Sequence, residues 1–294
     1  MSSPSSAIQS VLVENRVFFP SDAMVKSARI SGMDGYNALC KAAEDDFEGF
    51  WAQLARDNVV WNKPFTRTLD ESNAPFYKWF DDGELNASAN CLDKHMGTPN
   101  ENKTAVIFEA DDGAVTKTTY RELLSRVSQF ANALKADGIQ KGDRVLIYMP
   151  MIAEATFAML ACARIGAVHS VVFGGFAAGS LATRIEDASP TVIVSAEAGS
   201  RGGKVVEYKP LLDEAIATST HKPAAVLMVD RKLAAMNVVA GRDHLWADLR
   251  HQHRDAGAPH EREGQVLARL RFHAVQGQHP GQQRRGQRVA LYAL

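Results

Sequence analysis

Apolar residues between positions 144 and 204 follow two alternating patterns, one of strand length and one of helical spacing. The runs RVLIYM, HSVVF and TVIVSA are short and rich in β-branched residues, as buried strands are. Between them, MIAEATFAMLACARIG and AGSLATRIEDA carry apolar residues at helical spacing, and the alternation continues with a helix expected at 208–217 and a strand at 225–230. Strands joined by helices pair in parallel, with helices on both faces of the sheet. We therefore predict an α/β fold with a mostly parallel sheet and flanking helices.

The segment ahead of this sheet predicts a β-hairpin followed by a capped helix. In TAVIFEADDGAVTKTTYREL, a strand at 105–109 leads into an Asp-Gly turn and a return strand. Thr119 followed three residues later by Glu122 is a capping box, which opens a helix that we expect to end at Gly138.

The chain before residue 96 is predicted to be helical at first and then rich in loops. Residues 1–32 lack a sustained period and are expected to form an extended arm. Residues 33–54 have the pattern of one or two amphipathic helices, so we expect Trp51, and also Trp61, to be core residues rather than rings that stack on a ligand. The turn-rich segment after Trp61 is expected to pack through Phe65, Phe76, Trp79 and Phe80.

The end of the chain has a different composition. Residues 250–294 contain eight Arg, no Lys, seven Gln and five of the nine His, with no Ser, Thr, Asn or Ile. Such a bias does not assemble a packed element, so we expect disorder over 256–294. Two origins are open: a basic arm that binds nucleic acid, and, favoured here, the product of a shifted reading frame in a GC-rich gene.

The net charge and the apolar stretch of the chain argue against nucleic acid or a membrane as a partner. The formal net charge is −1, which offers no electrostatic reason to expect nucleic acid or an anionic membrane as a partner of the whole chain. The apolar stretch 145–176 exceeds the length of a transmembrane helix, but polar or helix-breaking residues interrupt it at Pro150, Glu154, Arg164, Gly166 and His169. A buried strand and helix unit explains the stretch better, and His169 is expected to be a hydrogen-bonded core residue.

Cysteine usage and the N-terminus favour a cytoplasmic protein. Cys40, Cys91 and Cys162 are odd in number and far apart, without the spacing of a metal site, so we expect them to be reduced. The first residues, MSSPSSAIQSVLVENR, lack the positive region and apolar core of a signal peptide.

Two glycine-containing loops, each after a predicted strand, are the candidate binding residues. The first is Phe173, Gly174 and Gly175, and the second is Arg201, Gly202, Gly203 and Lys204. Paired glycines let the backbone approach a ligand, and the two cations of the second loop suit a phosphate. Taken alone, each loop is more typical of a solvated turn. The sequence contains no Walker A, HExxH or GxSxG motif, so no catalytic or metal-binding residue is predicted.

The stretch IYMPMIAEATFAMLACARIGAVHSVVFGGF resembles the AMP-forming acetyl-CoA synthetases, with propionyl-CoA synthetase as the closest sibling, within the adenylate-forming ligases. The resemblance extends back through KWFDDGELNASANCLDKH and forward through RGGKVVEYKPLLDEAI to about GRDHLWADLRHQH, and it covers about residues 13–255. It implies a family N-terminal segment at 33–95, a partial ligase domain with an incomplete sheet at 96–255, and a non-homologous tail at 256–294.

The resemblance also implies a reaction and its ligands. Members of this family join acetate or propionate to coenzyme A through an acyl-adenylate, using ATP and Mg²⁺. Arg201 to Lys204 would hold the nucleotide end of coenzyme A, and Phe173 to Gly175 would lie against its adenine. The chain shows no counterpart of the family's YTSGTTGKPKG loop, so by itself we expect it to be inactive. A non-catalytic coenzyme A or nucleotide-binding module is the alternative, and neither nucleic acid nor a membrane is an expected partner.

Overall fold

A computed structural model of the protein describes residues 17–252, and the side chains of residues 17–249. The predicted tail at 256–294 lies outside the described residues. Contacts divide the chain into two units, Met1–Asp57 and Asn58–Leu294, which are described separately. Among the described helices, none is long and apolar enough to cross a membrane.

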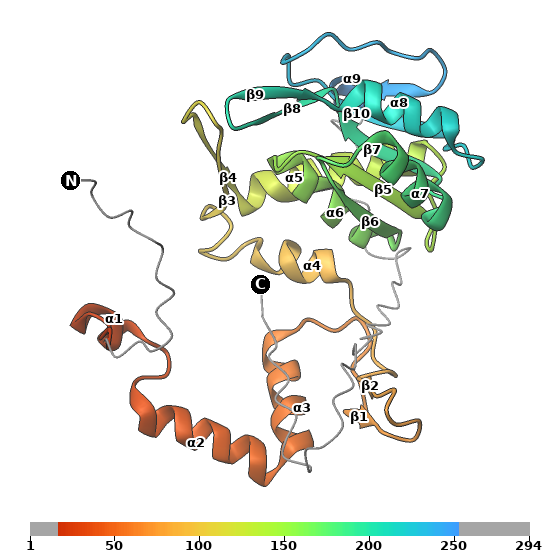
Figure 1. Ribbon diagram of the computed structural model, residues 1–294. Helices are drawn as coiled ribbons and strands as arrows, with labels where there is room; N and C mark the ends of the chain where they lie inside the picture. The colour runs from red at the N-terminus through yellow and green to blue at the C-terminus, as the bar shows by residue number, and fades with distance from the viewer. Residues whose placement is uncertain (1–16, 253–294) are drawn as a thin grey trace, which may run out of the picture. The chain divides into compact units, whose positions relative to one another are not determined.

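The described part of the first unit is helical (Figure 1). Helix α1 (Asp22–Ser27) departs from the predicted extended arm, because the Ser21 side chain caps it by accepting a hydrogen bond from the Met24 amide at 3.3 Å. The predicted amphipathic region forms two helices, α2 (Gly32–Asp45) and α3 (Phe47–Asn58).

The aromatic positions of the first unit are less buried than the helical pattern predicts. Tyr36 is 51% exposed and Phe47 is 50% exposed, whereas Trp51 is half-buried and meets Phe50 edge to face, with 5.4 Å between ring centroids. Aromatic residues at helical spacing are therefore not all buried in this unit. Helical spacing places residues on one face, but a unit with so few described elements has little with which to cover that face.

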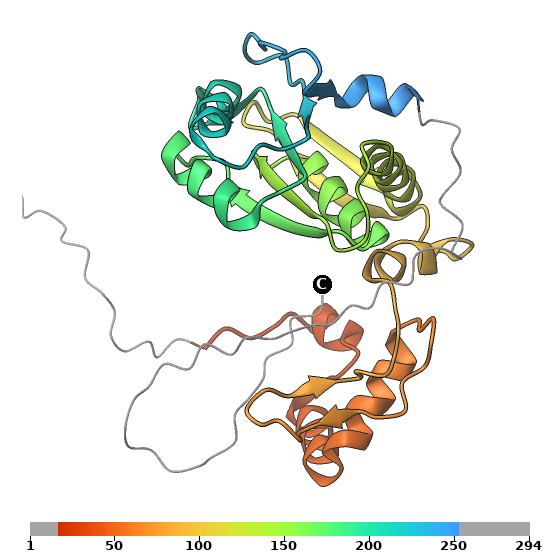
Figure 2. The ribbon, with the colours of Figure 1, turned by 90° about the vertical axis from the view of Figure 1, so that its right-hand side faces the viewer.

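The second unit begins with short elements around an aromatic cluster. Strands β1 (Leu69–Asp70) and β2 (Lys78–Trp79) pair antiparallel, and helices α4 (Ala87–Cys91) and η1 (Asp93–His95) follow, as Figure 2 shows. Trp61, Phe65 and Phe80 lie with ring centroids 4.5 to 5.7 Å apart, and Phe65 is buried. Phe76 is 64% exposed, so its predicted packing role was wrong.

The predicted hairpin and capped helix are present. Strands β3 (Thr104–Glu109) and β4 (Val115–Thr119) pair antiparallel, and α5 (Tyr120–Ala136) follows directly. Both hydrogen bonds of the capping box form: the Glu122 amide donates to the Thr119 hydroxyl at 3.2 Å, and the Thr119 amide donates to the Glu122 carboxylate at 2.8 Å.

A five-stranded parallel sheet forms the centre of the second unit and confirms the predicted α/β class. Its order is β11-β10-β7-β5-β6, and every neighbouring pair is parallel. The strands are β5 (Arg144–Met149), β6 (Val168–Phe173), β7 (Val192–Ala196), β10 (Ala225–Val229) and β11 (Asp243–Leu245).

Helices cover the sheet on both faces because side chains alternate along each strand (Figure 1). Val145 and Ile147 of β5 pack with α5, α6 (Ala153–Ile165) and Trp246, the first residue of α9 (Trp246–Gln252). Leu146 and Tyr148 point to the other face, where α7 (Ala178–Ala188) and α8 (Tyr208–Thr218) lie. The chain moves from β5 to β6 across one face, and from β6 to β7 and on to β10 across the other.

Strand β6 lies at one edge of the sheet, and this position changes the reading of His169. His169 is exposed, and Val168 and Val171 on the same strand are 54% and 56% exposed. Its predicted role as a core histidine was therefore wrong. An apolar run of strand length indicates a strand, but it does not say whether that strand is central or at an edge.

Candidate functional site

The predicted RGGK loop is the tip of a β-hairpin. Strands β8 (Ala198–Arg201) and β9 (Lys204–Glu207) pair antiparallel, and Arg201 faces Lys204 as the last pair before the turn. Gly202 and Gly203 have φ of +57° and +73°, a pair of left-handed positions that closes a two-residue hairpin and that side chains other than glycine rarely adopt. The glycines therefore fix both cations at one end of the hairpin.

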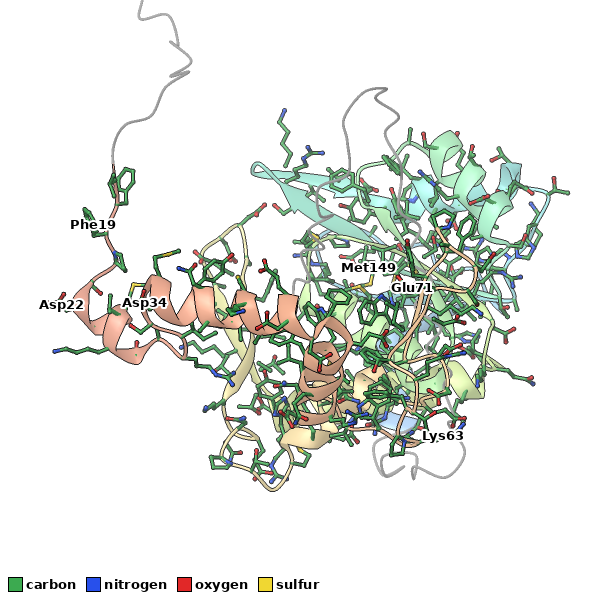
Figure 3. All side chains as sticks on the ribbon, turned by 90° about the horizontal axis from the view of Figure 1, so that it is seen from below. Phe19, Asp22, Asp34, Lys63, Glu71 and Met149 are labelled. Carbon is green, nitrogen blue, oxygen red and sulfur yellow. The ribbon has the colours of Figure 1, made fainter. Side chains whose placement is uncertain are left out.

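Both candidate loops lie at the carboxyl end of the parallel sheet. Phe173 ends β6 and the hairpin follows the end of β7, while Met149, labelled in Figure 3, ends β5 between them. The segments after β5 and β7 lead to helices on opposite faces. In open α/β sheets such a reversal leaves the crevice in which ligands bind. The fold thus brings the two loops to the place where a ligand site is expected.

The structure places Arg201 against the first loop. Its guanidinium carbon lies 5.7 Å from the centroid of the Phe173 ring, in a cation–π arrangement. An added Cβ at Gly175 would lie 3.3 Å from Arg201 Nη1 and 2.9 Å from the Phe173 ring. Residues 173–175 and 201 therefore form one surface.

The cations at the hairpin tip are available for an anion. Arg201 and Lys204 are exposed, and within the described part of the chain neither forms an ion pair with a carboxylate. Phe173, 58% exposed, presents a ring face beside them. An aromatic face next to two cations suits a planar base that carries phosphate.

The sequence pattern gave no indication that Gly199 and Tyr208 belong to this candidate site. An added Cβ at Gly174 would lie 2.7 Å from the Met149 carbonyl oxygen and 2.9 Å from the Tyr208 hydroxyl. At Gly199 it would lie 2.8 Å from the same hydroxyl and 3.1 Å from Pro150. Tyr208 starts a helix and looks like an ordinary apolar position there, so only the fold shows that it joins the two loops.

Glu197 anchors the base of the hairpin. This residue is 1% exposed, and its carboxylate accepts hydrogen bonds from the amides of Arg231 at 2.7 Å and Leu233 at 3.0 Å. Its backbone carbonyl accepts from the Tyr208 amide at 2.9 Å. The ends of β7 and β10 and the start of α8 are therefore tied to a single residue.

A second contact lies nearer the tip. The Ser200 hydroxyl donates a hydrogen bond of 2.5 Å to the carboxylate of Asp111, in the turn between β3 and β4. In Figure 1 the two hairpins extend on the same side of the sheet. The basic hairpin is thus held at its base by Glu197 and along its length by Asp111.

The described residues include no group of three or more His, Cys, Asp or Glu side chains that could hold a metal ion. The three cysteines are free thiols, and burial raises the pKa of Cys162 to about 12.

Comparison with known proteins gives two family matches. Residues 93–263 match the AMP-binding enzyme family, and residues 36–91 match the acetyl-coenzyme A synthetase N-terminus. The first match continues past the predicted boundary at 255 into residues that the structure does not describe.

The curated relatives are bacterial proteins named acetyl-coenzyme A synthetase. The chain is 57% identical to the one from Thiobacillus denitrificans over 243 residues, which are 83% of this chain and 37% of the relative. It is 54% identical to the one from Ralstonia pickettii over 253 residues, 86% of this chain and 38% of the relative. The chain thus spans little more than a third of the length of these relatives. The matches confirm the resemblance seen in the sequence: the chain belongs to the AMP-binding enzyme family.

Proposed function

We propose that this chain carries the coenzyme A side of an AMP-forming acetate–coenzyme A ligase. In the whole protein, ATP and Mg²⁺ would activate acetate to an acetyl-adenylate, and coenzyme A would then accept the acetyl group. The names of the relatives support acetate as the acyl substrate, and propionate stays the alternative.

One observation carries the proposal: the guanidinium of Arg201 lies 5.7 Å from the Phe173 ring centroid, at the carboxyl end of the sheet. The ring would receive the adenine of coenzyme A, and Arg201 with Lys204 would bind a phosphate of its nucleotide end. The glycines at 174, 175, 202 and 203 would let backbone and ligand approach closely.

A chimera tests the proposal. Residues 36–249 would replace the matching segment of the Thiobacillus denitrificans relative, and the two half-reactions would be measured separately. Arg201→Ala should raise the KM for coenzyme A by about tenfold or more, since a charge-assisted contact contributes about 1.5 to 3 kcal/mol. Pyrophosphate exchange without coenzyme A should stay close to the unsubstituted rate, because that half-reaction does not use the hairpin.

The matched control is Arg184→Ala, which removes the same charge from an exposed position on α7 and should leave both half-reactions unchanged. Equal loss of both half-reactions in Arg201→Ala would contradict the proposal, because Arg201 would then support the fold rather than the ligand. Coenzyme A binding by a chimera that forms no adenylate would favour the non-catalytic binding module.

A further inference from the structure

Tyr208 places a hydroxyl group between the two loops of the proposed coenzyme A site. It is the first residue of α8, and the backbones of Gly174 and Gly199 approach its phenol from two sides. A Cβ at Gly174 would lie 2.9 Å from the hydroxyl oxygen, and one at Gly199 would lie 2.8 Å from it. Side chains at these positions would cover the hydroxyl, so the glycines keep it open.

The Tyr208 hydroxyl has unused hydrogen-bonding capacity. Within residues 17–249 it forms no hydrogen bond to the protein, and it is not among the polar atoms that are both unpaired and fully buried, so solvent reaches it. Its neighbour Tyr148, with a ring centroid 5.2 Å away, differs: that hydroxyl donates to the Phe176 carbonyl oxygen at 3.1 Å. In the free protein water can accept from the Tyr208 hydroxyl, and a bound ligand could take the place of that water.

Two guanidinium groups lie near this hydroxyl. Burial raises the pKa of Tyr208, while the charges of Arg231 and Arg201 act to lower it, and burial prevails. The phenol therefore stays protonated and can donate. Arg231 Nη1 donates to the Ala198 carbonyl oxygen at 3.4 Å, which places this second cation at the base of the hairpin. An anion would be attracted to the space that the hydroxyl faces.

We propose that the Tyr208 hydroxyl is a further binding group of this site, which donates a hydrogen bond to a phosphate oxygen of coenzyme A. The inference rests on the proposed function, because it assumes that coenzyme A occupies the surface formed by Phe173 and Arg201. A neutral phenol adds direction to the attraction that the guanidinium groups supply, since a hydrogen bond requires alignment and a charge does not.

The test uses the full 294-residue chain and equilibrium titration by calorimetry, with coenzyme A and with pantetheine, which lacks all phosphates. Tyr208→Phe removes only the hydroxyl and keeps the ring that packs on Tyr148. We expect the Kd for coenzyme A to rise by about tenfold, and the Kd for pantetheine to stay the same. Tyr120→Phe, the same change on α5 where the ring lies tilted against His95, is the control and should alter neither Kd.

Thermal unfolding of Tyr208→Phe separates an effect on binding from an effect on folding. We expect its transition temperature to stay nearly unchanged, so that weaker binding of coenzyme A reflects the lost hydroxyl and not a loss of folded protein. An unchanged Kd for coenzyme A in Tyr208→Phe would overturn this inference alone, provided that Arg201→Ala still weakens binding. Equal weakening for coenzyme A and pantetheine would also overturn it, since the hydroxyl would then shape the surface rather than bind phosphate. No binding of coenzyme A by the unsubstituted chain would overturn the proposed function and this inference together.

Discussion

Replacing Gly174 by Ala should destabilise the protein, although alanine usually restricts the unfolded chain more than glycine and so stabilises. The added Cβ would lie 2.7 Å from the Met149 carbonyl oxygen, whereas ordinary van der Waals contact begins at 3.4 Å. That carbonyl belongs to the last residue of β5, which pairs with Phe173 in the sheet, so it has little room to move. The loop after β6 must therefore shift.

The expected cost is about 1 to 3 kcal/mol, the range found when extra carbon atoms are forced into a packed region. Urea unfolding at equilibrium, followed by fluorescence, would measure it as a lower transition midpoint with an unchanged slope. Because the loop also carries Phe173, coenzyme A should bind more weakly as well.

Gly179→Ala is the matched control. Gly179 lies in α7, a Cβ there would meet no atom within 4 Å, and its φ is not in the left-handed region. This substitution should stabilise the protein by up to about 1 kcal/mol, the difference in helix propensity between glycine and alanine. If both variants were as stable as the unsubstituted chain or more so, the close approach of the loop to β5 would be refuted.

Three further results are expected. Thr119→Ala should cost about 1 kcal/mol in urea unfolding, because it removes the cap of α5, and Thr119→Ser should restore most of it; equal loss in both would argue against the cap. The hydrogen bond from the Thr66 side chain, with support from backbone amides, lowers the pKa of Asp82 to about 2. Asp82 therefore stabilises the fold fully above its ordinary pKa of about 3.9, and this contribution shrinks as the pH falls through the folded pKa of about 2. Asp82→Asn should be less stable than the unsubstituted chain at pH 6, with a smaller difference at pH 2; a difference of the same size at both pH values would contradict the assignment. Asp111→Asn, measured by calorimetry, should weaken coenzyme A binding severalfold if the Ser200 contact orients the basic hairpin, and unchanged affinity would show that Glu197 suffices.

Local patterns predicted most elements of the second unit correctly, for a physical reason. The helix 178–188 and the strand 144–149 occur at the predicted positions, and the helix from Tyr208 ends within a residue of its predicted end. Caps, turns and periodicity act over a few residues, so they can be read directly from the chain. The α/β class followed in the same way, because strands that alternate with helices have few other arrangements.

Burial was predicted less well, since it depends on which elements meet. His169 is exposed because β6 is an edge strand, and Phe76 is exposed although its neighbours pack together. The spacing of apolar residues does not specify the order of the strands in the sheet. It also does not specify which elements pack against the apolar face of a helix.

The amino-acid sequence by itself determined the family, the parallel sheet and the basic and glycine-containing loops, because these are carried by contiguous residues. Only the tertiary structure decided that Arg201 lies on Phe173, that RGGK is the tip of a hairpin, and that the hydroxyl of Tyr208 lies between Gly174 and Gly199. The reason is that the order of the strands brings together segments that lie far apart in the chain: after the edge strand β6 the chain returns past β5 to β7, and the loops after β5, β6 and β7 meet at one end of the sheet.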